Sequence, residues 1–129
     1  MDDIRAALDP YVFQVRREAD LQAQVASLLA AVPSMAIDTE VRSGAGRYDL
    51  LVRHTIAAVF YQTTIVLELK LHSTAAAVER QTQRYALMPD VDAVGVVTTS
   101  RRLAASLLQG GPRSTLGGKP FFVIAVRTT

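Results

Sequence analysis

The chain has 129 residues, 50% of them hydrophobic, which suits one compact domain with a core, so we expect a single domain over residues 1–129. No run approaches the roughly 18–20 apolar residues of a membrane-spanning helix, and the start, MDDIRAALDP, lacks the basic and apolar regions of a signal peptide. The absence of cysteine excludes disulfides and thiolate metal sites and favours a cytoplasmic protein, while a formal charge of +2 is compatible with a nucleic-acid partner.

The N-terminal part of the chain predicts two helices. We expect a short helix over residues 2–8, interrupted near Pro10, and a longer helix over residues 14–31. The apolar residues that follow helical spacing on one face of the longer helix are Val15, Leu21, Val25 and Leu28. Glu18 is in line with this face, which predicts a carboxylate at the core or at its rim. Taken alone, Glu18 would be an ordinary solvated helix glutamate.

Three strands are predicted next. Residues 36–42 alternate in polarity, as in a strand with one face buried. A turn at residues 43–46 leads into a second strand over residues 47–53, and a third strand spans roughly residues 63–71. Residues 54–62 continue as strand or connection.

The second and third strands each carry charge inside an otherwise apolar run. Asp49 interrupts the second strand, and Glu68 and Lys70 interrupt the third. Side chains alternate faces along a strand, so Glu68 and Lys70 share one face. Because isolated charges in such a strand are costly unless they are paired or bind a metal, the pattern predicts that Asp49 and Glu68 converge on a divalent cation beside Lys70. The alternative is that Glu68 and Lys70 form a salt bridge on a solvated face.

The second half of the chain alternates between helices and strands. We expect a helix over residues 74–88, a valine-rich strand over residues 91–98 and a helix over residues 101–109. A flexible glycine-rich loop at 110–120 then leads into a last strand over residues 121–127. The order αβββαβαβ predicts an α/β fold in which a mixed β-sheet is flanked by helices.

The helix that follows the third strand presents a polar face. Gln81 and Tyr85 are four residues apart and share this face, with Arg84 alongside. Because the helix comes directly after the strand with Glu68 and Lys70, the face can lean over the same site. Gln81 and Tyr85 would then orient Lys70 or contact a nucleic-acid backbone. The alternative is a half-buried tyrosine with a satisfied hydroxyl and a surface glutamine.

The charged residues of the two strands resemble a known signature. Asp49 followed by Glu68-Leu69-Lys70 is similar to the D…ExK pattern of the PD-(D/E)XK nuclease superfamily, which has the restriction-endonuclease-like fold. One departure is that Tyr48 precedes the aspartate where the superfamily pattern has proline. A D…ExK pattern alone is weak, because short acidic patterns arise by chance.

Two neighbouring helices extend the resemblance. Gln81 and Tyr85 look like the QxxxY motif of some branches of the superfamily, and Glu18 sits where its members often have a further acid. The resemblance covers roughly residues 15–127 by the order of elements, which makes it a fold-level analogy. The order of these residues on helix, strand, strand and helix is a stronger signal than the D…ExK pattern.

The resemblance implies a Mg²⁺-dependent nuclease that hydrolyses DNA phosphodiester bonds, with a restriction-endonuclease-like core. Asp49, Glu68 and the backbone carbonyl of Leu69 would hold Mg²⁺, for which Mn²⁺ should substitute, and Glu18 would complete the shell directly or through water. Lys70 would orient the attacking water or stabilise the developing negative charge. Gln81 and Tyr85 would assist at the same site.

DNA is the partner that this interpretation requires. Arginines suit bidentate phosphate contacts, although a GC-rich coding genome explains the excess of arginine over lysine equally well. The arginines expected at the nucleic acid are Arg84, Arg101, Arg102 and Arg113. Cutting both strands of a duplex is most simply done by a homodimer, and Tyr11 and Phe13 would suit the centre of its interface if both rings are exposed.

Three hypotheses remain open for the function. The first is an active nuclease, whose small size leaves little room for a target-recognition domain, so that cleavage would be structure-directed or partner-directed. The second is a catalytically inactive nuclease-fold protein that binds nucleic acid or supports assembly. The third is a subunit of a larger restriction, repair or defence system, in which a partner protein supplies specificity. Retention of the acidic and basic site residues favours the active enzyme.

Overall fold

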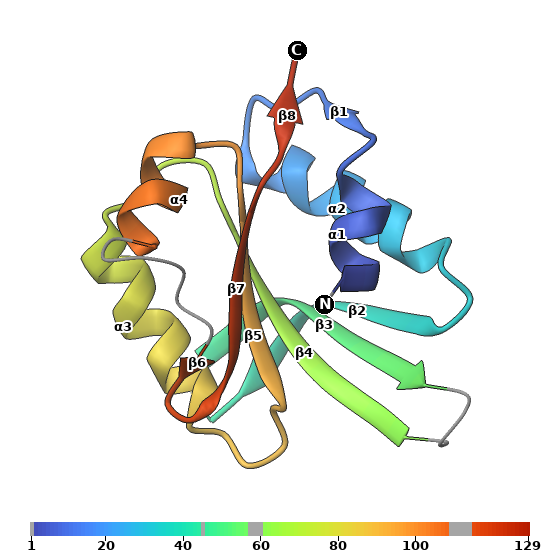
Figure 1. The fold of residues 1–129 in the computed structure, drawn as a ribbon, viewed down its shortest axis with the longest axis vertical. Helices are drawn as coiled ribbons and strands as arrows, with labels where there is room; N and C mark the ends of the chain where they lie inside the picture. Colours follow the sequence, from blue (N-terminus) through green and yellow to red (C-terminus); the bar gives the residue numbers. More distant parts are fainter. Residues whose placement is uncertain (1, 45, 57–60, 109–114) are drawn as a thin grey trace.

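The computed structural model describes residues 2–44, 46–56, 61–108 and 115–129. Within these residues, a six-stranded mixed sheet lies between α1 and α2 on one face and α3 and α4 on the other (Figure 1), which confirms the predicted α/β class. The helices are α1 (Asp2–Leu8), α2 (Glu18–Ala30), α3 (Ala75–Ala86) and α4 (Arg101–Leu107). The strands of the sheet are β2 (Met35–Ser43), β3 (Gly46–Ile56), β4 (Tyr61–Lys70), β5 (Ala93–Thr98), β6 (Thr115–Leu116) and β7 (Lys119–Ala125).

The sheet combines an antiparallel meander with two parallel crossovers. Its strand order is β2-β3-β4-β5-β7-β6, in which β2, β3 and β4 pair antiparallel and β4, β5 and β7 pair parallel. Helices α3 and α4 form the two crossovers, as parallel neighbours require. Strand β4 therefore lies in the middle of the sheet, and its residues from Ile65 to Leu69 are all buried. A charged side chain in this strand has no simple route to solvent.

Two hydrophobic cores cover the two faces of the sheet. Leu67 and Leu69 of β4 pack in the core beneath α1 and α2, with Leu21, Val25 and Leu29 of α2. Val66 packs in the opposite core, beneath α3 and α4, with Val78 of α3 and Leu103 of α4. The alternation of β4 thus points Glu68 toward the α3–α4 side.

Along β3, the regular alternation of side chains between the two faces of the sheet is interrupted at Asp49. Leu50 packs in the α1–α2 core, whereas Tyr48 packs in the α3–α4 core, so residues two apart lie on opposite faces. The paired positions of β2 and β3 skip Glu40 and Asp49, and Glu40 has a positive φ of 52°. The pairing of β3 with β4 ends at Leu50–Leu67. Asp49 therefore lies where the regular pairing of β3 with both neighbours is interrupted, while the register of β2 and β3 stays the same on either side of it.

The structure corrects two predicted element boundaries. Helix α2 begins at Glu18 and not at residue 14, because the Asp20 carboxylate accepts the N–H groups of Arg16 and Arg17, both at 3.0 Å, and holds Arg17 extended. The predicted loop at 110–120 contains β6 and the start of β7, while its residues 110–114 lie outside the described residues. Gly117 and Gly118 both have positive φ, 58° and 79°, which suits a two-residue hairpin turn.

The N-terminal aromatic residues do not form an exposed pair. Phe13 lies in β1 (Val12–Phe13), which pairs parallel with β8 (Arg127–Thr128), and its ring is fully buried in the α1–α2 core. Tyr11 is 39% exposed and packs edge-on against Phe13, with ring centroids 4.8 Å apart. The condition that both rings are exposed is therefore not met, because Phe13 is buried in the α1–α2 core, and the homodimer stays a prediction. The described helices include none with the length and apolar character to cross a membrane.

Candidate active site

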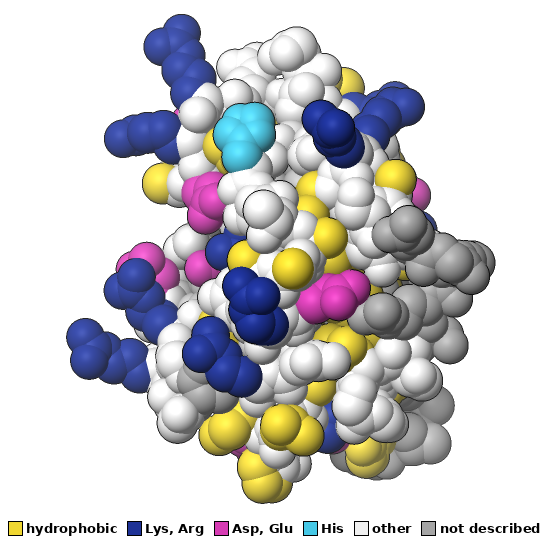
Figure 2. All heavy atoms as spheres, turned by 90° about the vertical axis from the view of Figure 1, so that its left-hand side faces the viewer, with side chains coloured by type: hydrophobic (Ala, Val, Ile, Leu, Met, Phe, Trp, Pro, Cys, Tyr) yellow, Lys and Arg dark blue, Asp and Glu magenta, His cyan; other side chains and the backbone are white. Residues whose placement is uncertain are grey.

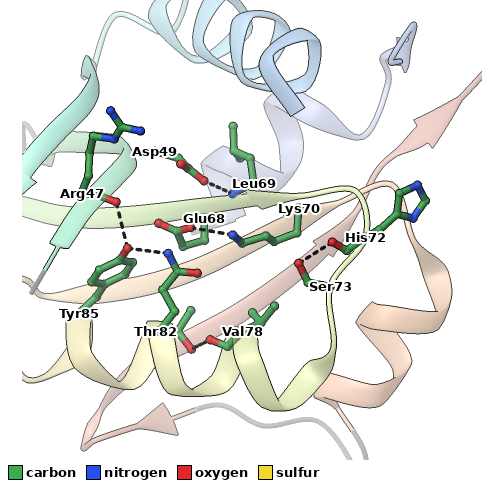
Figure 3. Close-up of polar contacts among 11 residues, drawn as sticks. Arg47, Asp49, Glu68, Leu69, Lys70, His72, Ser73, Val78, Thr82 and Tyr85 are labelled. Atoms are coloured by element: carbon green, nitrogen blue, oxygen red, sulfur yellow. Dashed lines mark hydrogen bonds and ion pairs between the residues drawn. The ribbon is translucent and has the colours of Figure 1, made fainter. Parts of the chain in front are cut away.

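Glu68 is a buried carboxylate in the middle of the sheet. Its side chain is 0% exposed, and neither of its oxygens has a hydrogen-bond partner among the described residues. The nearest positive charge is Lys70 Nζ, 3.7 Å from Glu68 Oε2 (Figure 3). Burial, reinforced by the negative charge of Asp49, raises the pKa of Glu68 to about 8. A buried carboxylate in this state holds a proton or takes up a cation.

Asp49 lies beside Glu68 because strands β3 and β4 separate there. Beyond Leu67 the backbone of β4 has no partner in β3, and the Leu69 N–H donates to Asp49 Oδ2 at 2.9 Å (Figure 3). The N–H and C=O of a strand residue point toward the same neighbouring strand, so the Leu69 carbonyl also lies on the side of Asp49. The break in pairing thus places carboxylate oxygens and a backbone oxygen next to Glu68.

Lys70 supplies the positive charge of the site. It lies two residues after Glu68, so both side chains are on the α3–α4 side of the sheet, and 17% of its side chain is exposed. The separation of 3.7 Å from Glu68 is longer than a hydrogen bond, so the ammonium compensates the carboxylate only in part. The surrounding surface is not an open solvated face, which speaks against the alternative of a surface salt bridge.

Helix α3 contributes a chain of hydrogen bonds at the edge of the site. Gln81 Nε2 donates to the Tyr85 hydroxyl at 2.9 Å, and the hydroxyl donates to the Arg47 carbonyl at 3.0 Å (Figure 3). The Tyr85 ring is buried and packs edge-on against Tyr48, with centroids 4.8 Å apart. Burial, followed by the charge of Glu68, raises the pKa of Tyr85 to about 12, so the hydroxyl keeps its proton and remains a donor. These two hydrogen bonds connect the start of β3 to α3.

The structure does not bring Glu18 to this site. Glu18 is the first residue of α2 and is exposed, and the first buried residue of that helix is Leu21. Across the described parts of the chain, no three His, Cys, Asp or Glu residues come together as a possible metal group. The prediction that Glu18 points to the core or its rim is wrong, because the helix starts at this residue, where a carboxylate is stabilised by the helix dipole in solvent.

The arginines expected at a nucleic acid are spread over two helices. Arg84 is exposed on α3, next to Gln81, and lines an open groove. Arg101 and Arg102 are exposed in the first turn of α4. Arg113 lies outside the described residues. Contacts of these arginines with phosphates stay a prediction.

Two residues of the site were not predicted from the sequence. The Arg47 carbonyl accepts the Tyr85 hydroxyl, and the hydroxyl of Tyr48 is buried without a hydrogen-bond partner in the described structure. A signal for the change at Asp49 was present, because Tyr48, Leu50 and Leu51 lack the strict alternation of a regular strand. Arg47 takes part through its backbone carbonyl, which every residue type has, so this role could not be predicted from the sequence.

Comparison of the chain with protein-family models, with curated proteins and with solved structures gave no match. The donor atoms of the site are all oxygen. They are the two Glu68 oxygens, which lack hydrogen bonds from the described residues, the Asp49 carboxylate and the Leu69 carbonyl. Mg²⁺ prefers oxygen ligands, takes one or two carboxylates from a protein and keeps several waters. The donor set fits this ion.

Proposed function

We propose that the chain is a Mg²⁺-dependent nuclease with a restriction-endonuclease-like core, which hydrolyses phosphodiester bonds in DNA. The observation that carries the proposal is the buried carboxylate of Glu68, which has no hydrogen-bond partner in the described structure and lies beside Asp49 and Lys70 where two strands separate. Burying a carboxylate without hydrogen bonds costs several kcal/mol, which supports a role for Glu68 in holding a ligand that compensates its charge. The two acids and the lysine of this site are also the residues that the resemblance to the PD-(D/E)XK nucleases assigns to phosphodiester hydrolysis.

Each residue of the site has a role in this proposal. Asp49, Glu68 and the Leu69 carbonyl would hold Mg²⁺, which would supply neutralisation of phosphate charge and activation of water. Lys70 donates hydrogen bonds to the attacking water or to the phosphate oxygen on which negative charge develops. Its distance of 3.7 Å from Glu68 leaves its ammonium hydrogens available for such contacts.

Gln81 and Tyr85 act as positioning residues. Their hydrogen bonds run to the Arg47 carbonyl, and Asp49 follows two residues later in the same strand. The pair therefore fixes the start of β3 against α3, which sets the position of the Asp49 carboxylate. This differs from the expectation that the two side chains orient Lys70 directly or contact a nucleic acid.

A second candidate is a nuclease-fold protein that binds DNA without cutting it. The observation that favours it is that Glu18 is exposed on α2, so the expected third carboxylate does not reach Asp49 and Glu68. An active site with two carboxylates still suits Mg²⁺, which retains waters in its remaining positions. We therefore place the active enzyme first, with a homodimer or a partner protein as the expected route to double-strand or directed cleavage.

The test is cleavage of supercoiled, linear, single-stranded and branched DNA with Mg²⁺, Mn²⁺ or a chelator. We expect Asp49→Asn and Glu68→Gln each to reduce cleavage at least about 10²-fold, because each removes one of the few charged ligands. Asp90→Asn, which changes an exposed carboxylate in the turn after α3, is the matched control and should cut normally. Calorimetric Mn²⁺ binding that is equal in wild type and Glu68→Gln would overturn the assignment.

A further inference from the structure

A polar pocket lies just beyond the ends of strands β4 and β5. Lys70 and Thr98 are the last paired residues of these two parallel strands. The pocket follows them, has a volume of about 300 Å³, and is lined by the polar side chains of His72, Ser73, Thr74, Ser100, Arg102 and Ser106. Open α/β sheets bind their ligands in crevices outside the carboxyl ends of their strands. The position of the pocket therefore makes it a candidate ligand site.

The pocket lies on the same side of the sheet as Glu68. Leu103, which also lines it, is buried in the α3–α4 core, and the alternation of β4 points Glu68 and Lys70 toward that core. His72 follows Lys70 by two residues, so their Cα atoms lie at most about 7 Å apart. Figure 3 shows His72 and Ser73 in the turn between Lys70 and α3. The pocket and the candidate active site are therefore neighbours on one face.

The side chains of the pocket carry positive charge. Arg102 is exposed in the first turn of α4, and its guanidinium is permanently charged. The ion pairs found among the described residues involve neither Arg102 nor His72, and no aspartate or glutamate is among the described residues that line the pocket. Figure 2, which looks onto the side of α3 and α4, shows a histidine together with Lys and Arg side chains at the surface. This lining suits an anion and not a cation.

Hydroxyl groups add hydrogen-bond donors around the same space. The Thr74 hydroxyl oxygen accepts the Ala77 N–H at 3.2 Å, and the Ser100 hydroxyl oxygen accepts the Leu103 N–H at 3.0 Å. Because each oxygen serves as an acceptor in these bonds, its hydrogen remains available to donate to a ligand. Ser106 lines the pocket from the second turn of α4. Several donors around one small space match the acceptor oxygens of a phosphate.

We propose that this pocket binds a phosphate group of a DNA strand, next to the phosphate at the Glu68 site, with Arg102 as its principal contact. A guanidinium offers two parallel N–H groups to phosphate oxygens, and serine and threonine hydroxyls are common further contacts of the nucleic-acid backbone. The identity of the strand rests on the proposed nuclease function, whereas binding itself does not require cleavage.

The size of the pocket suits one phosphate and not a longer stretch of the strand. A volume of about 300 Å³ is at the lower end of the range for small-ligand pockets. The phosphate is either a linkage within the strand, with one negative charge, or a terminal phosphate, with nearly two at neutral pH. An internal linkage would make the pocket a guide for the strand at the active site. A terminal phosphate would direct the enzyme to DNA ends.

The test is binding of short fluorescent duplexes of mixed sequence, measured by anisotropy in a chelator so that no strand is cut. We expect Arg102→Gln to weaken binding about tenfold, as for other hydrogen bonds to charged groups, and to reduce the slope of log K against log salt by about 0.9. The matched control, Arg16→Gln, removes an exposed arginine before α2 and should change neither quantity. A loss in Arg102→Gln for duplexes with hydroxyl ends identifies an internal linkage. A loss confined to duplexes with a 5′- or 3′-phosphate identifies a terminal one.

Amide NMR shifts test whether the contact lies in the pocket. On titration with the same duplex, we expect the amide signals of His72, Ser73 and Ser106 to shift in wild type and to shift much less in Arg102→Gln. Equal affinities and salt slopes in wild type and Arg102→Gln, or pocket signals that do not move in wild type, would overturn the proposal. An absence of Mg²⁺-dependent cleavage together with binding that depends on Arg102 would remove the nuclease proposal and leave the pocket standing, so the two failures are distinguishable.

Discussion

The two faces of strand β4 are equally buried, but one face carries apolar side chains and the other carries the carboxylate of Glu68. On the α1–α2 side, Leu67 and Leu69 are packed among aliphatic side chains and are complete within the fold. On the α3–α4 side, Glu68 is just as inaccessible, yet neither oxygen has a hydrogen-bond partner in the described structure. Burial stabilises the first face and destabilises the ionised form of the second. The comparison separates the face whose side chains stabilise the fold from the face on which a carboxylate has no hydrogen-bond partner among the described residues.

Single substitutions on the two faces of β4 test this comparison most directly. We expect Leu67→Ala to lower the free energy of unfolding by about 2–5 kcal/mol, because it leaves a cavity in the α1–α2 core. Glu68→Gln, measured without metal at pH 8, should not lower it, because it removes a buried carboxylate. Urea unfolding measures both, with the exposed Leu87→Ala as control. A loss in Glu68→Gln as large as that in Leu67→Ala would contradict the distinction.

The pH dependence of stability gives a second test. The unfolded chain ionises Glu68 above about pH 4.5, whereas the folded protein keeps the proton until about pH 8, so unfolding releases a proton between these values. The stability contributed by the protonated group is therefore full below pH 4.5 and is lost as the pH rises to 8, at up to about 1.4 kcal/mol per pH unit.

The Glu68→Gln variant isolates this effect from the other titrating groups. Its free energy of unfolding should lack the decline that wild type shows between the two pKa values, as measured by urea titrations at several pH values. Saturating Mg²⁺ should flatten the wild-type decline, because a bound cation compensates the ionised carboxylate. Identical pH profiles of the two proteins without metal would show that Glu68 is not held protonated in the fold.

The smallest expected effect concerns the hydrogen bonds at the edge of the site. Tyr85→Phe leaves the Arg47 carbonyl without its donor, which should cost about 1 kcal/mol of stability. Because Asp49 lies two residues beyond Arg47, we also expect Mn²⁺ binding to weaken about 10-fold, as for other groups that orient metal ligands. Tyr61→Phe changes an exposed ring and is the control for both. Normal metal affinity in Tyr85→Phe would limit the hydroxyl to a structural role.

Much of the fold and the centre of the site follow from local patterns in the sequence. The charges at Glu68 and Lys70, set two apart in an apolar run, predicted both the strand and the shared face that the structure has. Asp49 and Glu68 come from β3 and β4, which pair up to Leu50–Leu67 as neighbouring strands of the predicted meander. Periodicity is sufficient for these features because they depend on neighbours close in sequence.

The features that sequence reasoning missed depend on contacts or backbone geometry that residue types do not encode. Glu40 adopts a positive φ, which is uncommon for a residue other than glycine, and the change of facing at Asp49 accompanies it. Phe13 is buried by a strand from the other end of the chain. Glu18 fits the apolar stripe by spacing, but the Asp20 cap starts the helix there and leaves it in solvent.

The pairing of β1 with β8 has a consequence for the order of folding. The Arg127 guanidinium donates to the Asp9 carbonyl across a sequence separation of 118 residues, whereas the hydrogen bonds at the site span 20 and 38 residues. Closing a loop of more than a hundred residues costs more chain entropy than closing either shorter loop. We expect the meander and α3 to form early and the β1–β8 seam to close late. Destabilising changes at the seam should therefore speed unfolding and leave the refolding rate nearly unchanged.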